Sequence, residues 1–250
     1  MPKLTVPALK HVPELDPGFV PASLWNQAFR DNCSDGNSRE IRIAIFRPDG
    51  TGTIHTERIL RNEDDESAIL NFRLIERVVK FLLWSFGGTQ VVLEDAPSLA
   101  QALSDHYCEG GKRHFDVDYS RRFFGKTLTF SSESTETFSI PRVTQKSESQ
   151  IGLKGNRIGF DLGGSDRKCA AVINGEVVFS EEVTWDPYFQ SDPAYHREGI
   201  IDSIRLAAAH LPKVDAIGGS AAGDYVDSKV RAASPSRGVP TELLRAPVAK

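Results

Sequence analysis

The residues best suited to chemistry follow one another in a stretch of 26 residues, 157–182. Glycine adopts positive φ at low cost, so a glycine pair in a turn could aim backbone N–H groups at an anion and let it approach closely. A serine adds a hydroxyl, an arginine or lysine adds a cation, and an aspartate adds an oxygen ligand suited to Mg²⁺. The pattern therefore predicts a corner that binds phosphate together with a divalent cation. Its members are, in order, Asp161, Gly163, Gly164, Ser165, Arg167 and Lys168.

The same residues also have a purely structural interpretation. A tight hairpin needs small residues in its turn, and its charged side chains are then simply solvated. Asp166 favours this second interpretation because it puts a negative charge beside the expected phosphates, unless it points to solvent or to Arg167. The residue types alone leave both interpretations open.

The flanking pattern places this turn on a β-hairpin. Apolar runs at Ile158–Leu162 and Cys169–Ile173 lie on either side of it, and a third strand, Glu176–Phe179, follows across Asn174-Gly175. Asn-Gly between two apolar runs is among the strongest short-range hairpin signals. A helix over 194–210, with Pro193 in its first turn, and a strand over 214–217 are expected next.

A second glycine-rich segment, 218–223, follows that strand. Gly-x-Ser-x-small is close to the nucleophile elbow of α/β-hydrolases, in which a serine occupies a sharp strand-to-helix turn. This pattern makes Ser220 a candidate nucleophile and a serine hydrolase an alternative function. Such enzymes place their histidine after the serine, whereas the last histidine here, His210, precedes Ser220.

The sequence D-L-G-G-S-D-R-K, 161–168, with two strands behind it, resembles the first phosphate motif of the actin, Hsp70 and sugar-kinase superfamily. Within that superfamily it is most similar to the ROK group of sugar kinases and repressors. The later V-D-A-I-G-G-S-A-A-G-D-Y-V-D, 214–227, resembles the strand and sugar-side loop of the same group. The resemblance covers Asn156 to about Gly238. Serine replaces the threonine usual in the family at position 165, which keeps the hydroxyl.

The resemblance implies an α/β fold with a ribonuclease-H-like partial lobe of the actin and sugar-kinase type. It implies transfer of a phosphoryl group from ATP to a hexose, with Mg²⁺ held by Asp161. The residues implied to bind the cofactors ATP and Mg²⁺ are Asp161, Gly163, Gly164, Ser165 and Lys168. Those implied to contact the sugar substrate are Ser220 and Asp227.

Several parts of the family pattern do not occur in the sequence up to Lys250. In the family the aspartate that acts as base lies in a motif beyond the position that matches Lys250, as do the zinc motif and the second phosphate motif. We therefore expect a fragment or a divergent, truncated member that is inactive alone. A non-catalytic sugar-sensing or interaction protein is the alternative from a different class. The repressors of the group carry an N-terminal helix-turn-helix, and no such pattern occurs here.

Residues 1–130 predict a smaller α/β unit of unassigned role, and 131–156, rich in Ser, Thr, Glu and Lys, predict an exposed linker to the lobe at 157–250. In the first unit we expect strands at 41–46, 53–60, 91–93 and 127–130, and helices at 22–29, 67–86, 97–106 and 117–124. Both units open with a hairpin, so one hypothesis makes the first a degenerate copy of the second. The last residues, 234–250, predict a loop.

Composition constrains the class of protein. The chain has 250 residues, 40% hydrophobic and 26% charged, with a net charge of −4. These values are typical of a globular protein and give no reason to expect nucleic-acid binding. Three widely spaced cysteines favour a reducing compartment, and no apolar run approaches a membrane span. We expect a cytoplasmic protein without a membrane or nucleic-acid partner, and homo-oligomer formation stays open.

Overall fold

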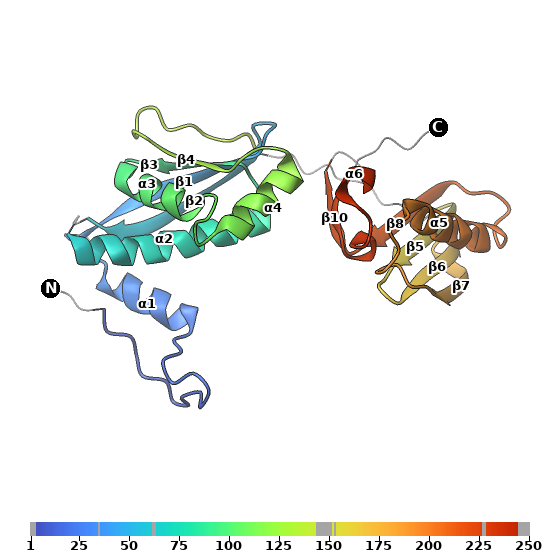
Figure 1. Cartoon of the computed structure of the whole chain (residues 1–250), viewed down its shortest axis with the longest axis horizontal. Coiled ribbons are helices and arrows are strands. Elements are labelled where there is room, and N and C mark those ends of the chain that lie inside the picture. The colour runs from blue at the N-terminus through green and yellow to red at the C-terminus, as the bar shows by residue number, and fades with distance from the viewer. Residues whose placement is uncertain are drawn as a thin grey trace. The chain divides into compact units, whose positions relative to one another are not determined.

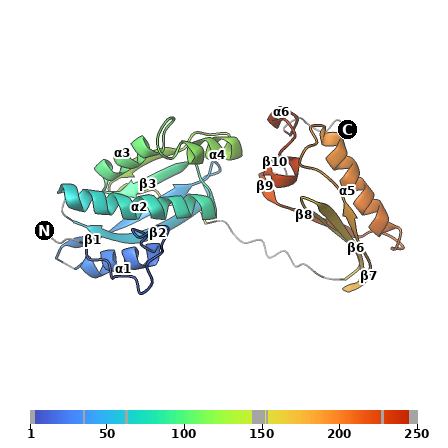
Figure 2. The same cartoon turned by 60° about the horizontal axis from the view of Figure 1, so that its bottom comes forward.

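The computed structural model describes residues 4–34, 36–61, 64–143, 152, 154–226 and 229–244. The chain divides into two compact units, Met1–Gln145 and Lys146–Lys250 (Figures 1 and 2). Each unit has its own sheet and its own hydrophobic core. None of the helices in the described part of the chain is long and apolar enough to cross a membrane.

The first unit is a mixed four-stranded sheet with the order β2-β1-β3-β4. β1 pairs antiparallel with both β2 and β3, whereas β3 and β4 are parallel. Helix α2 crosses one face of this sheet (Figure 2). The elements are α1 (Ala22–Asn32), β1 (Ser38–Phe46), β2 (Gly52–Leu60), α2 (Asp65–Phe86), β3 (Gln90–Glu94), α3 (Pro97–His106), α4 (His114–Phe124) and β4 (Thr129–Glu133).

Helix α2 organises the core of the first unit. Asp64 caps its N-terminus by accepting a hydrogen bond from the Ser67 N–H at 2.9 Å, and Gly87 ends it with a φ of 71°. Leu74, Ile75 and Val79 lie on its inner face and are fully buried, together with the isoleucines of β1. The apolar spacing that predicts this helix identifies the packed face only in part, since Leu74 and Leu82 of that spacing are buried whereas Phe81 is 66% exposed.

Two predictions for the first unit are wrong: the start of the linker at residue 131, and the hypothesis that this unit is a copy of the second. The strand expected at 127–130 is β4, which continues to Glu133, and Phe138 is buried against Ala44 and Val92 on the face of the sheet opposite α2. The first part of the expected linker 131–156 therefore belongs to the first unit, and 144–151 and 153 lie outside the described residues. The first unit is also not a copy of the second, since β1 and β3 are antiparallel at the position where the second unit has a parallel pair.

The second unit contains a four-stranded sheet with the order β7-β6-β5-β8. Its first three strands form an antiparallel meander, and α5 crosses over to β8, which lies parallel to β5 on the other side. This order and these directions are those of a ribonuclease-H-like partial lobe, so the predicted fold class is confirmed. The elements are β5 (Asn156–Leu162), β6 (Asp166–Ile173), β7 (Glu176–Thr184), α5 (Pro193–Ala208), β8 (Ala216–Ala221), β9 (Gly223–Val226), β10 (Lys229–Ala233), a 3₁₀ turn (Ser234–Ser236) and α6 (Thr241–Leu244).

The glycine-rich segment after α5 differs from the sequence prediction. Strand β8 covers Ala216–Ala221, so residues 218–220 lie in a strand and not in a loop. Pairing with β5 outweighs the poor strand propensity of glycine, and a bare Gly219 leaves room for the ring of Phe160. The β9–β10 pair follows β8, and a 3₁₀ turn and α6 lie within the region predicted as a terminal loop, 234–250, of which 245–250 lie outside the described residues.

Candidate functional site

The sheet of the second unit has two chemically different faces, because successive side chains of a strand point to opposite sides. On one face Ile158, Cys169 and Ala171 pack with Ala207 of α5 into a small core. The pairing of the strands places polar and charged residues together on the opposite face: Asp161, Lys168, Glu182 and Ser220. We call this polar face the open face.

Asp161 and Ser220 form the centre of the candidate site. They lie directly opposite each other on the parallel strands β5 and β8, near the carboxyl ends of both. The Ser220 hydroxyl donates a hydrogen bond to Asp161 Oδ1 at 2.5 Å, and both residues are exposed. The structure thus brings together the predicted metal ligand and one of the predicted substrate contacts.

Lys168 completes a row of charges across the open face. Its ammonium forms an ion pair with Asp166 and lies 3.7 Å from Glu182 Oε2. The ion pair with Asp166 is the main cause of a raised pKa of Lys168, and Glu182 and Asp161 add to it. In return, the hydrogen bonds from Lys168 and then from Ser165 lower the pKa of Asp166; the Ser165 hydroxyl donates at 2.9 Å. The cation predicted for phosphate is therefore engaged by an internal carboxylate.

The two glycines of the hairpin turn play a different structural role from the predicted one. Neither Gly163 nor Gly164 has a positive φ. The Gly163 N–H donates to the Asp166 carbonyl at 2.9 Å within the hairpin, so this amide is already used. A Cβ on Gly164 would lie 1.9 Å from the Tyr188 hydroxyl, and one on Gly163 would lie 2.8 Å from the Asp166 carbonyl. The glycines allow close packing, and the prediction that they provide positive φ is wrong.

A hollow of about 500 Å³ lies on the open face beside these charges. Small residues of three neighbouring strands form its floor and leave the sheet backbone accessible, while the charged row forms its polar end. The residues of the open face that line it are Gly159, Asp161, Lys168, Ala170, Ser180 and Glu182.

Arg167, the alternative cation, points to the other face. It is buried beneath α5, where its guanidinium donates to the Ser203 hydroxyl at 2.8 Å and forms an ion pair with Asp202. Strand alternation could have predicted this, since Arg167 and its neighbour Lys168 must face opposite sides. Asp227, the other predicted sugar contact, lies outside the described residues.

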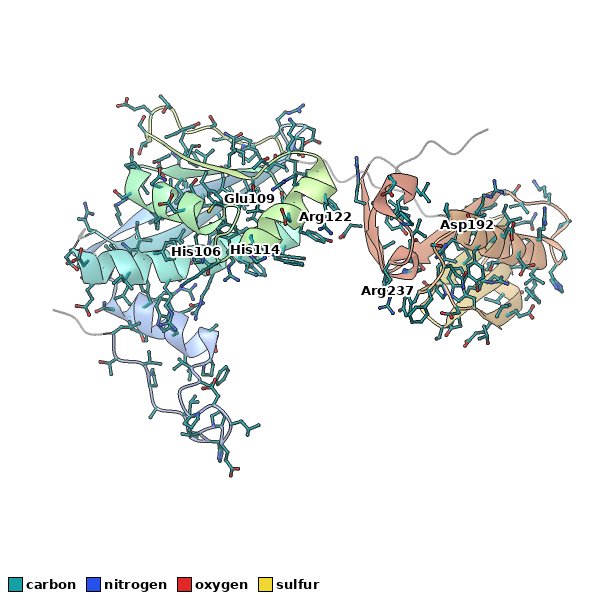
Figure 3. All side chains as sticks on the ribbon, viewed as in Figure 1. His106, Glu109, His114, Arg122, Asp192 and Arg237 are labelled. Atoms are coloured by element: carbon teal, nitrogen blue, oxygen red, sulfur yellow. The ribbon has the colours of Figure 1, made fainter. Side chains whose placement is uncertain are left out.

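Aromatic and imidazole groups near the turn serve packing. Trp185 is buried, and its indole N–H donates to the Gly163 carbonyl at 3.0 Å. The guanidinium of Arg237, labelled in Figure 3, lies 3.7 Å from the centre of the Tyr188 ring. The Trp185 hydrogen bond therefore ties the hairpin turn to the segment that follows β7.

The prediction of a serine hydrolase is wrong. A nucleophile elbow requires a sharp turn from a strand into a helix. Ser220 instead lies inside β8, and the next element is the strand β9. Its hydroxyl donates to the carboxylate of Asp161 and not to a histidine.

The donor atoms of the open face fit one kind of metal site only. Among the described residues, no group of three or more His, Cys, Asp or Glu side chains could hold a metal ion. Mg²⁺ in phosphate-binding sites, however, takes one or two carboxylates and completes its shell with waters and phosphate oxygens. Asp161, exposed and steadied by Ser220, fits that role, in which the ion would neutralise phosphate charge.

Comparisons with known proteins assign neither a family nor an activity to the chain. No protein-family model matches the chain, and a search of curated proteins found no similar sequence. Among solved structures, a Ppx/GppA family member from Aquifex aeolicus is 14% identical with a TM-score of 0.18, covering 73% of this chain and 62% of that one. An exopolyphosphatase from Cytophaga hutchinsonii is 10% identical with a TM-score of 0.22, covering 74% and 64%. The chain thus spans less than two thirds of either protein, and no residue assignment here rests on these weak likenesses.

Proposed function

We propose that the second unit binds the phosphates of a nucleotide together with Mg²⁺ on the open face, beside Asp161. The observation that carries this proposal is the pairing of Asp161 with Ser220 at the carboxyl ends of two adjacent parallel strands. Ligands of open α/β sheets characteristically bind at that edge. The motif resemblance and the ribonuclease-H-like strand order both support the same location.

The finer proposal is a ROK-like sugar kinase, in which ATP phosphorylates a hexose. In phosphoryl transfer the protein contributes mostly positioning and charge stabilisation. Asp161 would hold the cation, Lys168 would contact phosphate oxygens once released from Asp166, and Ser220 would orient Asp161. The other described carboxylates in this row of charges, Asp166 and Glu182, both lie beside the Lys168 ammonium. Neither is assigned as the base, so the chain by itself is proposed to bind without turnover.

A second candidate is a non-catalytic sugar-binding protein, and two contacts favour it. Lys168 is held by Asp166, and the Gly163 amide is closed within the hairpin. Both contacts reduce the number of groups in the turn that are free to bind phosphate. A protein that binds sugar without nucleotide needs neither group.

Isothermal titration calorimetry on the full chain distinguishes these functions. Mg·ATP and a hexose are titrated separately into the wild type, Asp161→Asn and the matched control Asp186→Asn, which alters an exposed aspartate of the same unit. Nucleotide binding that is lost in Asp161→Asn and kept in Asp186→Asn supports the phosphate site. Hexose binding without Mg·ATP binding refutes the kinase proposal in favour of the second candidate.

A coupled assay with hexose and ATP tests the proposed inactivity. We expect no turnover by the isolated chain. Turnover that disappears in Asp161→Ala would refute the inactivity while supporting the site.

A further inference from the structure

A cavity of about 870 Å³ lies on the α5 side of the second unit, away from the open face. It is bounded by β5 and β8, the N-terminal half of α5, and the segment from β10 to α6. Phe160 and Leu162 face it, whereas Asp161 between them points to the open face. The cavity therefore lies on the other side of the sheet from the Asp161 carboxylate, although Ser220 also lines it and Phe160 borders both hollows.

The lining is mainly aliphatic and aromatic. Among the described residues, only four form the buried part of the small core next to the cavity. Their side chains do not fill the cavity, which therefore extends the apolar interior of the unit. Its volume lies within the range of about 300–1,000 Å³ that is usual for small-molecule sites. The large apolar side chains that line it include Phe160, Leu162, Ile200, Val230, Val239 and Leu243.

One polar side chain of α5, Arg197, gives the cavity its chemical specificity. Arg197 lines it and is exposed, and within the described residues no carboxylate lies within 4 Å of its guanidinium. Arginine matches a carboxylate in both charge and shape, because its fork of donors can bind both oxygens. Asp192, labelled at the start of α5 in Figure 3, also lines the cavity, but its carboxylate caps the helix by accepting from the Ala194 N–H at 2.8 Å.

His196 is the second polar group in the lining. Its side chain is more than nine-tenths buried, and Nε2 lies 3.2 Å from the Pro187 carbonyl and 2.9 Å from the Pro235 carbonyl. Carbonyl oxygens only accept hydrogen bonds, so these contacts assign the ring proton to Nε2. Nδ1 is buried and has no hydrogen-bond partner in the described structure. His196 therefore fixes α5 against the segments of Pro187 and Pro235, and it offers no accessible hydrogen-bonding atom to the cavity.

We propose that this cavity binds a small carboxylate with an apolar body, of the medium-chain fatty-acid class. The chain lies between the sheet and α5, against Phe160 and Ile200, and the carboxylate pairs with Arg197 at the exposed end. The proposal does not depend on nucleotide binding, since none of these side chains belongs to the open face.

Calorimetric titration of the full chain with decanoate and with decan-1-ol tests the proposal. The two probes share an apolar chain and differ in the charged head. Arg197→Ala should weaken decanoate binding at least tenfold and leave decanol binding unchanged. The matched control is Arg205→Ala, which removes another exposed arginine of α5 that does not line the cavity.

A filling variant and a site variant complete the test. Ile200→Trp should abolish binding of both probes by occupying the cavity, with circular dichroism confirming the fold. Asp161→Asn should leave decanoate binding unchanged, which separates this site from the proposed phosphate site. The proposal is overturned if decanoate does not bind saturably, if Arg197→Ala and Arg205→Ala behave alike, or if Ile200→Trp binds as well as the wild type.

Discussion

Replacing Gly219 by alanine tests the register of β8, on which the whole candidate site depends. A Cβ at this position would lie 2.2 Å from Cζ of Phe160, far inside van der Waals contact. Either the phenylalanine ring or the strand must therefore move. The neighbouring Gly218 is the matched control, since a Cβ there would meet nothing within 4 Å.

The expected difference in unfolding free energy follows from these two environments. Overpacking typically costs about 1–3 kcal/mol, and the low end applies here because the Phe160 ring borders a cavity into which it can move. Alanine at an unhindered glycine with ordinary φ typically stabilises by about 0.4–1 kcal/mol, because the unfolded chain loses freedom. Gly218→Ala should therefore exceed Gly219→Ala in stability by about 1.5–2 kcal/mol. For a unit of about 100 residues this corresponds to a difference in Tm of at least about 6 °C.

Thermal and urea unfolding of the full chain, followed by far-UV circular dichroism, measure this difference. Equal stability of the two variants would contradict the packing of Phe160 over Gly219. If Gly218→Ala were the less stable variant, β8 would be shifted by one residue relative to β5. Such a slip would turn Ser220 to the α5 face and separate it from Asp161, removing the candidate site.

Three further predictions concern charge and hydrogen bonding. Asp166→Asn should strengthen Mg·ATP binding about fivefold in low salt, because removing one unit charge at contact distance in water changes the binding free energy by about 1 kcal/mol. Weaker binding of Mg·ATP in calorimetry would contradict the proposed competition between Asp166 and phosphate for Lys168. Hydrogen bonds from Arg42 lower the pKa of Glu94 to about 2 from an ordinary 4.5, so its stabilising contribution is complete above about 4.5 and is lost as the pH falls towards 2. Acid unfolding of Arg42→Ala should accordingly show a flatter pH dependence than the wild type in that window. Ser220→Ala should weaken Mg·ATP binding less than Asp161→Asn does, as measured in the same titrations, because it removes only the hydrogen bond to the carboxylate.

Local patterns predicted the elements of the fold well where side chains alternate or repeat clearly. Helix α3 occupies the predicted residues 97–106, and α2 begins two residues before its predicted start. The fold class of the second unit followed from the family resemblance and not from periodicity. Strand β8 shows the limit of local patterns, since a run of glycines predicts a loop until its partner strand is known.

The candidate site was predicted in its composition and only partly in its geometry. Residue types and the resemblance identified Asp161 and Lys168, which lie opposite each other on β5 and β6. The contact between Asp161 and Ser220 spans 59 residues and depends on the parallel pairing of β5 and β8, which no local pattern contains. The role of Gly164 depends likewise on Tyr188, 24 residues later, so its φ could not be inferred from the turn alone.

The charge balance of the open face leads to a last prediction. Asp161, Asp166 and Glu182 surround Lys168, so the four groups carry a net charge of −2 before any ligand binds. A nucleotide without its metal would bring further negative charge to this face and be repelled. ATP should therefore bind only in the presence of Mg²⁺.

In the double variant Asp166→Asn, Glu182→Gln the four positions are neutral overall, and metal-free ATP should begin to bind in calorimetry at low ionic strength. Equal affinity of the wild type for ATP in Mg²⁺ and in EDTA would mean that the phosphates lie away from these carboxylates. The proposal that the nucleotide binds on the open face would then be wrong.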